Sequence, residues 1–127
     1  MLSNAPVGPN IPTKNLEQAR KYYSEVLGLE EAPAEEHGAA LFKCGKGTML
    51  MIYEKQNYTP EHTLATWIVD DLDAEMAELR GRGVKFEDFD VPGARTTNQV
   101  GTSKTARMAW FKDPDGNTLA LLARVPS

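Results

Sequence analysis

Histidine and cysteine, which often carry catalysis and metal binding, are rare in this 127-residue sequence. His37 and His62 are the only histidines, and Cys44 is the only cysteine. The sequence contains no Ser/His/Asp or Cys/His arrangement for nucleophilic catalysis, and no glycine-rich loop that leads into a helix and cradles a phosphate. Glu54 and His62 are the weak candidates for acid–base catalysis, since carboxylates and imidazoles are common proton carriers. An imidazole and a carboxylate without a third donor make a poor metal site, so no metal or other cofactor is predicted.

The composition is that of one ordinary globular domain, with 41% hydrophobic and 25% charged residues. A net charge of −4 argues against a nucleic-acid partner, because phosphate binding needs a basic face. No run approaches the roughly 20 apolar residues of a membrane span, and residues 1–6 lack the pattern of a secretory signal. A single cysteine excludes an internal disulfide and is typical of a reducing compartment. We therefore expect a cytoplasmic protein that contacts neither nucleic acid nor membrane.

The most informative stretch lies near the end of the chain, where two apolar runs flank the turn residues 113–117. Pro114 fixes φ for a turn, Asp113 and Asp115 can accept hydrogen bonds from nearby backbone N–H groups, and Gly116 tolerates positive φ. Short apolar runs separated in this way predict a β-hairpin over residues 106–122.

The elements that precede this hairpin occur in two similar halves, at residues 7–54 and 64–124, joined by a polar connection at 55–63. In the first half we expect an extended segment at 7–13, a helix from the N-cap Asn15 to Leu27, a weak strand at 29–36 followed by a His37–Gly38 turn, and a hairpin of strands 39–44 and 48–53. In the second half we expect a strand at 64–69, a helix capped by Asp70 or Asp71, and a strand at 84–89. This repetition predicts an α+β domain over residues 1–127, with two paired βαβββ modules forming a curved mixed sheet around a cavity.

Residues 91–104 form a long connection for a compact domain, which predicts either a mobile cover over the cavity mouth or disorder. Arg95, Lys104 and Arg107 would present positive charge to an anionic ligand, although a solvated loop explains them equally well.

The order of these motifs resembles the vicinal oxygen chelate superfamily, which includes glyoxalase I, extradiol dioxygenases, fosfomycin-resistance transferases and bleomycin-resistance proteins. The resemblance covers nearly the whole chain. It rests on the following segments taken together: Asn15–Ala19, Tyr22–Tyr23, Val26–Leu29, Val69–Leu72, Gly83–Val84 and Phe111–Asn117.

Metal-dependent members of that superfamily carry a His in the first strand, a second His at the start of the fifth strand and a Glu after the last turn. At the matching positions this sequence has Gly8, Leu64 and Ala120, none of which has a side-chain donor for Zn²⁺, Mn²⁺ or Fe²⁺. The resemblance therefore implies a member without the usual metal site.

Alternation along the strands, combined with the resemblance, predicts which side chains line the cavity. The predicted ligand-binding residues are mostly apolar, with Trp110 as the one large aromatic, which suits an organic ligand held by burial and stacking. They are Asn10, Leu50, Ile52, His62, Leu64, Thr66, Met108, Trp110 and Ala120. Ala109, Phe111, Leu119 and Leu121 are expected to pack on the helices instead.

The leading hypothesis is a metal-free small-molecule-binding protein, comparable with bleomycin-resistance proteins and assembled as a homodimer. One alternative is a glyoxalase-, lyase- or isomerase-like enzyme with a displaced or metal-free site that uses Glu54, His62 and Asn10. A second alternative is an accessory module whose cavity is vestigial.

Overall fold

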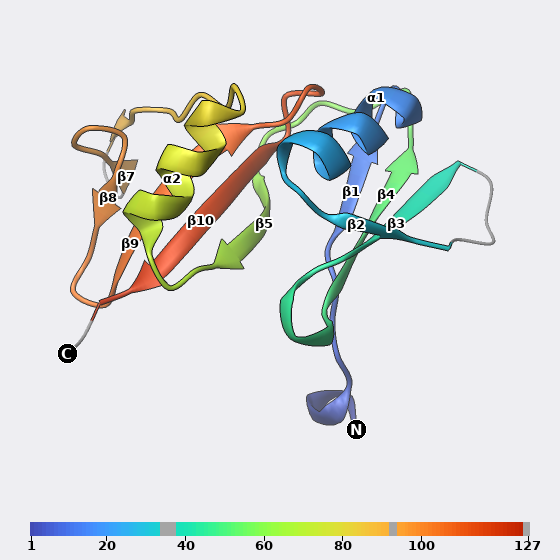
Figure 1. The fold of residues 1–127 in the computed structure, drawn as a ribbon, viewed down its shortest axis with the longest axis horizontal. Coiled ribbons are helices and arrows are strands. Elements are labelled where there is room, and N and C mark those ends of the chain that lie inside the picture. Colours follow the sequence, from blue (N-terminus) through green and yellow to red (C-terminus); the bar gives the residue numbers. More distant parts are fainter. Residues whose placement is uncertain (34–37, 92–93, 126–127) are drawn as a thin grey trace. The chain divides into compact units, whose positions relative to one another are not determined.

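The computed structural model describes residues 1–33, 38–91 and 94–125 (Figure 1). The chain divides into two compact units, residues 1–60 and 61–127, which are described separately below. Each unit contains one four-stranded mixed sheet. None of the helices in the described ranges has the length and hydrophobicity needed to cross a membrane.

The sheet of the first unit has the strand order β1-β4-β3-β2, with β1 parallel to β4 and the other neighbours antiparallel. Its elements are β1 (Asn10–Thr13), α1 (Leu16–Lys21), β2 (Glu30–Ala32), β3 (Ala39–Lys43) and β4 (Met49–Glu54), with short 3₁₀ turns at Leu2–Asn4 and Gly45–Gly47.

Helix α1 begins where its N-cap signal places it, and the helical segment that it opens ends just before the predicted stop at Gly28. The Asn15 side chain accepts a hydrogen bond of 3.1 Å from the backbone N–H of Gln18, which confirms the predicted N-cap. The helix continues as a π-helical turn, Tyr22–Val26, and the chain leaves it at Gly28, whose φ of 74° favours glycine. The helical segment buries Tyr23 completely, with its ring 6.0 Å from that of Phe42.

The sheet of the second unit repeats the same arrangement in the order β5-β10-β9-β8, with β5 parallel to β10. Its elements are β5 (Thr63–Ile68), α2 (Leu72–Gly81), β8 (Gly101–Thr102), β9 (Ala106–Lys112) and β10 (Thr118–Arg124), together with a separate two-stranded ribbon of β6 (Asp90–Val91) and β7 (Ala94–Arg95). In both units the first strand lies parallel to the last, so the predicted duplication and the α+β class are confirmed.

The polar groups predicted to define α2 and the last hairpin act as expected. Asp71 caps α2 by accepting a 3.0 Å hydrogen bond from the N–H of Ala74. The Asp113 carboxylate accepts hydrogen bonds from the backbone N–H groups of Asp115 and Asn117, at 3.0 and 2.9 Å, in the turn between β9 and β10.

Residues 84–104 differ from the prediction. The expected strand at 84–89 is reduced to one antiparallel bridge between Phe86 and Phe111, and the fourth place in the sheet belongs to β8. The described part of the expected loop contains short strands and a tight turn in which Thr97 and Val100 exchange hydrogen bonds of 2.8 and 3.1 Å. His37 and residues 34–36 of the expected strand lie outside the described residues.

Candidate functional site

The register of the second sheet assigns its two faces. Trp110 lies opposite Ala120, Met108 lies opposite Leu122, and Ala120 lies beside Thr66, so these side chains share one face. The other face carries the residues that pack toward α2, as predicted, namely Ala109, Phe111, Leu119 and Leu121. Phe111 is only 1% exposed and meets Phe86 edge to face at 5.6 Å between ring centroids.

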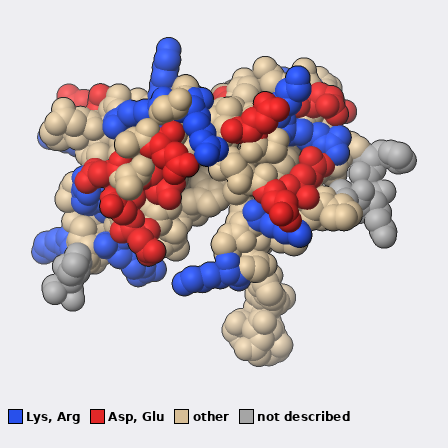
Figure 2. Space-filling model, viewed as in Figure 1, with Lys and Arg blue, Asp and Glu red and all other residues tan. Residues whose placement is uncertain are grey.

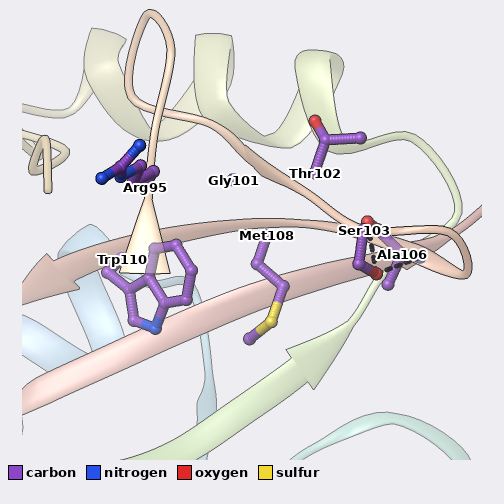
Figure 3. Close-up of a pocket in the computed structure, with 7 residues that line it drawn as sticks. All are labelled: Arg95, Gly101, Thr102, Ser103, Ala106, Met108 and Trp110. Atoms are coloured by element: carbon purple, nitrogen blue, oxygen red, sulfur yellow. Dashed lines mark hydrogen bonds between the residues drawn. The ribbon is translucent and has the colours of Figure 1, made fainter. Parts of the chain in front are cut away.

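A pocket of about 380 Å³ opens on the Trp110 face of the second unit. Figure 3 shows the Met108 and Trp110 side chains next to each other on β9, with Arg95 at the Trp110 end of the pocket and Ser103 and Ala106 at the other. Gly101 and Thr102 complete the lining.

The indole of Trp110 is held by two close contacts. A Cβ added to Gly101 would lie 3.1 and 3.2 Å from ring carbons Cζ3 and Cη2 of Trp110, closer than side chains normally approach. The ring of Phe89 meets the indole edge to face, at 5.5 Å and 90°. Glycine at position 101 therefore lets the indole rest directly against the backbone of β8, and Phe89 fixes its orientation.

The alternation predicted for β4 is wrong. Ile52 pairs in register with Ile11 and Leu50 with Phe42, and these side chains are buried on one face, with Leu50 1% and Ile52 0% exposed. Both positions of the alternation in Met49–Ile52 are apolar, so hydrophobicity alone could not distinguish the faces.

The opposite face of the first unit carries Asn10 together with Met49 and Met51. These three residues and Gly8 border a pocket of about 410 Å³, which Leu50 also borders although almost none of its surface is exposed. Asn10 is thus placed on an open face, as predicted, but beside methionines instead of Leu50 and Ile52.

The three positions that the resemblance assigns to metal ligands carry residues without a side-chain donor atom. Leu64 is half-buried at the register shift between β5 and β10, and Ala120 is completely buried beneath the Trp110 face. A Cβ at Gly8 would lie 2.4 Å from the carbonyl oxygen of Met49, so the backbone leaves no room for any ligand side chain at that position. Among the described residues, no group of three His, Cys, Asp or Glu side chains is arranged to hold a metal ion.

The two acid–base candidates belong to different units, Glu54 at the end of β4 and His62 just before β5. The imidazole of His62 is 84% exposed, and its Nε2 lies 4.0 Å from a carboxylate oxygen of the neighbouring Glu61. Glu54 is exposed, and its backbone N–H donates to the carbonyl of Gly38. Their catalytic role remains a prediction.

The sheet of the second unit also borders a polar pocket of about 430 Å³, which lies on the face toward α2. Its lining includes Asp73 and Arg80 of α2 and Arg107 of β9. Both terminal nitrogens of Arg107 donate to the Asp73 carboxylate, at 3.1 and 3.3 Å. This hydrogen-bonded charge lowers the pKa of Asp73 and raises the pKa of Arg107. Such pairing recurs elsewhere, as between Arg20 and Glu31, and acidic and basic side chains interleave over the face shown in Figure 2.

Four lining residues of the Trp110 pocket were not predicted, namely Gly101, Thr102, Ser103 and Ala106. The unusual length of segment 91–104 was the sequence signal for the first three, whereas Ala106 follows the alternation of Met108 and Trp110 along β9. Of the three cations noted in or beside that segment, Arg95 lines the pocket, Arg107 faces α2, and Lys104 does not contribute to the lining.

Solved structures with the same fold cover nearly the whole chain. A Bacillus anthracis protein described as glyoxalase family aligns with a TM-score of 0.76 at 22% identity, over 96% of both chains. The antibiotic binding protein TnmS3 from Streptomyces sp. CB03234 aligns with a TM-score of 0.71 at 25% identity, over 98% of this chain and 99% of that one. The oxidase ChaP-H2 aligns at 18% identity with a TM-score of 0.65, over 94% of this chain and 93% of its own.

None of the curated protein sequences matches this chain significantly. The family model described as the Glyoxalase/Bleomycin resistance protein/Dioxygenase superfamily matches residues 7–121, which span almost the whole sequence. Together with two mixed sheets in which the first strand runs parallel to the last, this match shows that the chain belongs to the Glyoxalase/Bleomycin resistance protein/Dioxygenase superfamily.

Proposed function

We propose that this protein binds a small organic molecule that contains a flat ring, and that it does so without a metal ion. The observation that carries the proposal is the pocket of about 380 Å³ built around Trp110 and Met108. Its volume lies in the range of roughly 300–1,000 Å³ that is usual for small-molecule sites.

The lining favours a ring over a small polar metabolite. An indole offers a broad apolar face, and a thioether is polarizable and adapts its shape to an aromatic ligand. Because Gly101 and Phe89 already hold the indole, little rotamer freedom remains to be lost when a ligand stacks on it. Thr66, which is exposed, shares this sheet face and extends its surface beyond the pocket.

The metal-free part of the proposal rests on donor chemistry. Gly8, Leu64 and Ala120 provide no side-chain oxygen, nitrogen or sulfur, and at Gly8 the backbone of Met49 occupies the space a side chain would need. Ligand binding should therefore survive chelation.

An antibiotic binding protein at 25% identity over almost the full length supports binding as the function. The alternative of a metal-free enzyme needs an acid–base pair, and the strong exposure of His62 gives that alternative no positive support. We also propose that the protein forms a homodimer, because each four-stranded sheet ends in edge strands, beside which a strand of a second copy could add.

The proposal is tested with naphthamide, a neutral bicyclic amide, as the probe. Binding is measured by following the indole N–H resonances of Trp67 and Trp110 in ¹⁵N-labelled protein, before and after treatment with a chelator. We expect a saturable shift of the Trp110 resonance that is unchanged by chelation. Loss of the shift on chelation, with recovery on adding Zn²⁺ or Mn²⁺, would show that the metal-free proposal is wrong.

A further inference from the structure

We infer that Arg95 selects for ligands that carry a carboxylate next to the ring, so that the Trp110 pocket prefers an aromatic carboxylate to its neutral counterpart. This inference rests on the proposed function and adds the chemical class of the ligand.

Arg95 is the only charged side chain among the residues that line the pocket in the described part of the chain. Its backbone carbonyl lies 3.4 Å from the position of a Cβ on Gly101, the residue against which the indole packs. Arg95 and Trp110 therefore meet around Gly101, and Figure 3 shows both at the same end of the pocket. A ring stacked on the indole would bring a substituent within reach of the guanidinium.

The guanidinium is only weakly engaged by the protein itself. Within the described ranges its one ion pair joins Nε to Oδ1 of Asp90 at 3.6 Å, which is too long for a normal hydrogen bond. Both side chains are strongly exposed, at 73% for Arg95 and 93% for Asp90, so water screens this pair. A ligand carboxylate that makes two parallel N–H···O bonds would replace it with a better-aligned contact.

The other polar groups near the pocket are less suited to an anion. The Ser103 hydroxyl already donates to the carbonyl of Ala106 at 3.3 Å and accepts from the N–H groups of Thr105 and Ala106, all within its own turn. Arg107 lies on the opposite face of β9 and is bound to Asp73. Thr102, which is exposed and lines the pocket, offers a hydroxyl that can assist Arg95 but carries no charge.

No acidic side chain lines the pocket in the part of the chain that the structure describes, so the local field favours an anion although the protein as a whole is acidic. A planar guanidinium at the same end of the pocket as a planar indole suits a ligand in which the carboxylate is coplanar with the ring. Aromatic carboxylates have this shape.

The test compares naphthoate with naphthamide, which has the same ring and a neutral group of similar size. Dissociation constants for both are measured from the Trp110 indole resonance in the unaltered protein, in Arg95→Gln, and in Lys104→Gln. Lys104→Gln is the matched control because it removes the same charge from the same segment but from a residue outside the pocket lining.

We expect naphthoate to bind about threefold to tenfold more tightly than naphthamide, the scale of a solvent-accessible charge-assisted contact. The preference should disappear in Arg95→Gln and persist in Lys104→Gln. Equal affinities for the two compounds in the unaltered protein, or a preference for naphthoate that survives Arg95→Gln, would overturn the inference. In either case, tight binding of naphthamide would still support the proposed function. Absence of any Trp110 shift with both compounds would overturn both.

Discussion

Trp110 and Phe111 are consecutive residues of β9 whose side chains point to opposite faces of the sheet. We predict that Phe111→Ala lowers the free energy of unfolding by about 3–5 kcal/mol, because it leaves a cavity beside Phe86. Trp110→Ala should cost less stability but weaken ligand binding by about 1–3 kcal/mol, as expected for an aromatic anchor. Denaturant unfolding and probe titration of both variants measure these effects. If Trp110→Ala unfolds the protein and Phe111→Ala leaves it stable, the two faces have been assigned the wrong way round.

Whether the sequence predicted the correct sheet face for a side chain depended on the strand that carries it. In β9 and β10 the final hairpin fixed the register, so Met108, Trp110 and Ala120 were correctly assigned to one face. In β4 four consecutive apolar residues gave no contrast, and Leu50 and Ile52 were assigned to the wrong face. The partners of Trp110 could not be foreseen, because Gly101 and Phe89 reach it through tertiary contacts that leave no periodic signal.

The hydroxyl of Thr96 holds residues 88 and 89, in the segment that follows α2, by hydrogen bonds. Thr96 Oγ1 donates to Asp88 at 2.8 Å and accepts from the backbone N–H of Phe89 at 2.8 Å, which holds this segment beside Trp110. We predict that Thr96→Val, which keeps the shape of the side chain, lowers stability by about 1–2 kcal/mol and speeds hydrogen exchange of the Phe89 amide.

Thr97→Val is the matched control for this substitution. Thr97 is exposed, and the hydrogen bonds recorded for it within the described residues come from its backbone. Its substitution should leave both stability and Phe89 exchange nearly unchanged. Equal effects at the two positions would show that the Thr96 hydroxyl does not organise this segment.

The ion pair between Asp73 of α2 and Arg107 of β9 links helix to sheet and makes stability depend on pH. Arg107 lowers the pKa of Asp73 below its ordinary value near 3.8, so the stabilisation is fully present above that value and is lost as the pH falls through the lowered pKa. We predict that Asp73→Asn destabilises the protein slightly at neutral pH and that the difference vanishes in acid.

Denaturant unfolding at a series of pH values checks this dependence. Glu78→Gln serves as a control, because the ion pair between Glu78 and Arg82 lies at the end of one helix and does not link α2 to the sheet. A difference between Asp73→Asn and the unaltered protein that grows toward low pH would contradict the assigned role.

Elements with a local chemical signature could be predicted, and elements defined by long-range pairing could not. The caps Asn15 and Asp71 and the turn at Asp113 use side-chain hydrogen bonds to residues two to four positions away. Strand β8, in contrast, contains only two residues, which pair with Met108 and Arg107, and its polar, glycine-containing sequence carries no strand pattern. The fourth strand was therefore expected at 84–89.

In each unit the first strand lies parallel to the last, as the duplicated sequence pattern predicted. The pattern of each half is weak, but its occurrence twice in the same order made the prediction possible. Each sheet ends in edge strands, β1 and β2 in the first unit and β5 and β8 in the second, and Ile68 of β5 is 67% exposed. We predict that a second copy of the chain pairs with one of these edges. Sedimentation at micromolar concentration should show a species of about twice 14.0 kDa, and a single species near 14.0 kDa would contradict this prediction.

The central claim is that a ring-containing ligand binds at Trp110 without a metal. It is tested most directly by titrating chelator-treated, ¹⁵N-labelled protein with naphthoate while the two indole N–H resonances are recorded. Trp67 lies on the opposite face of its sheet and provides an internal control. The account predicts a saturable shift of the Trp110 resonance with little change at Trp67. A shift at Trp67 alone, or a Trp110 shift that appears only after a metal is added back, would contradict it.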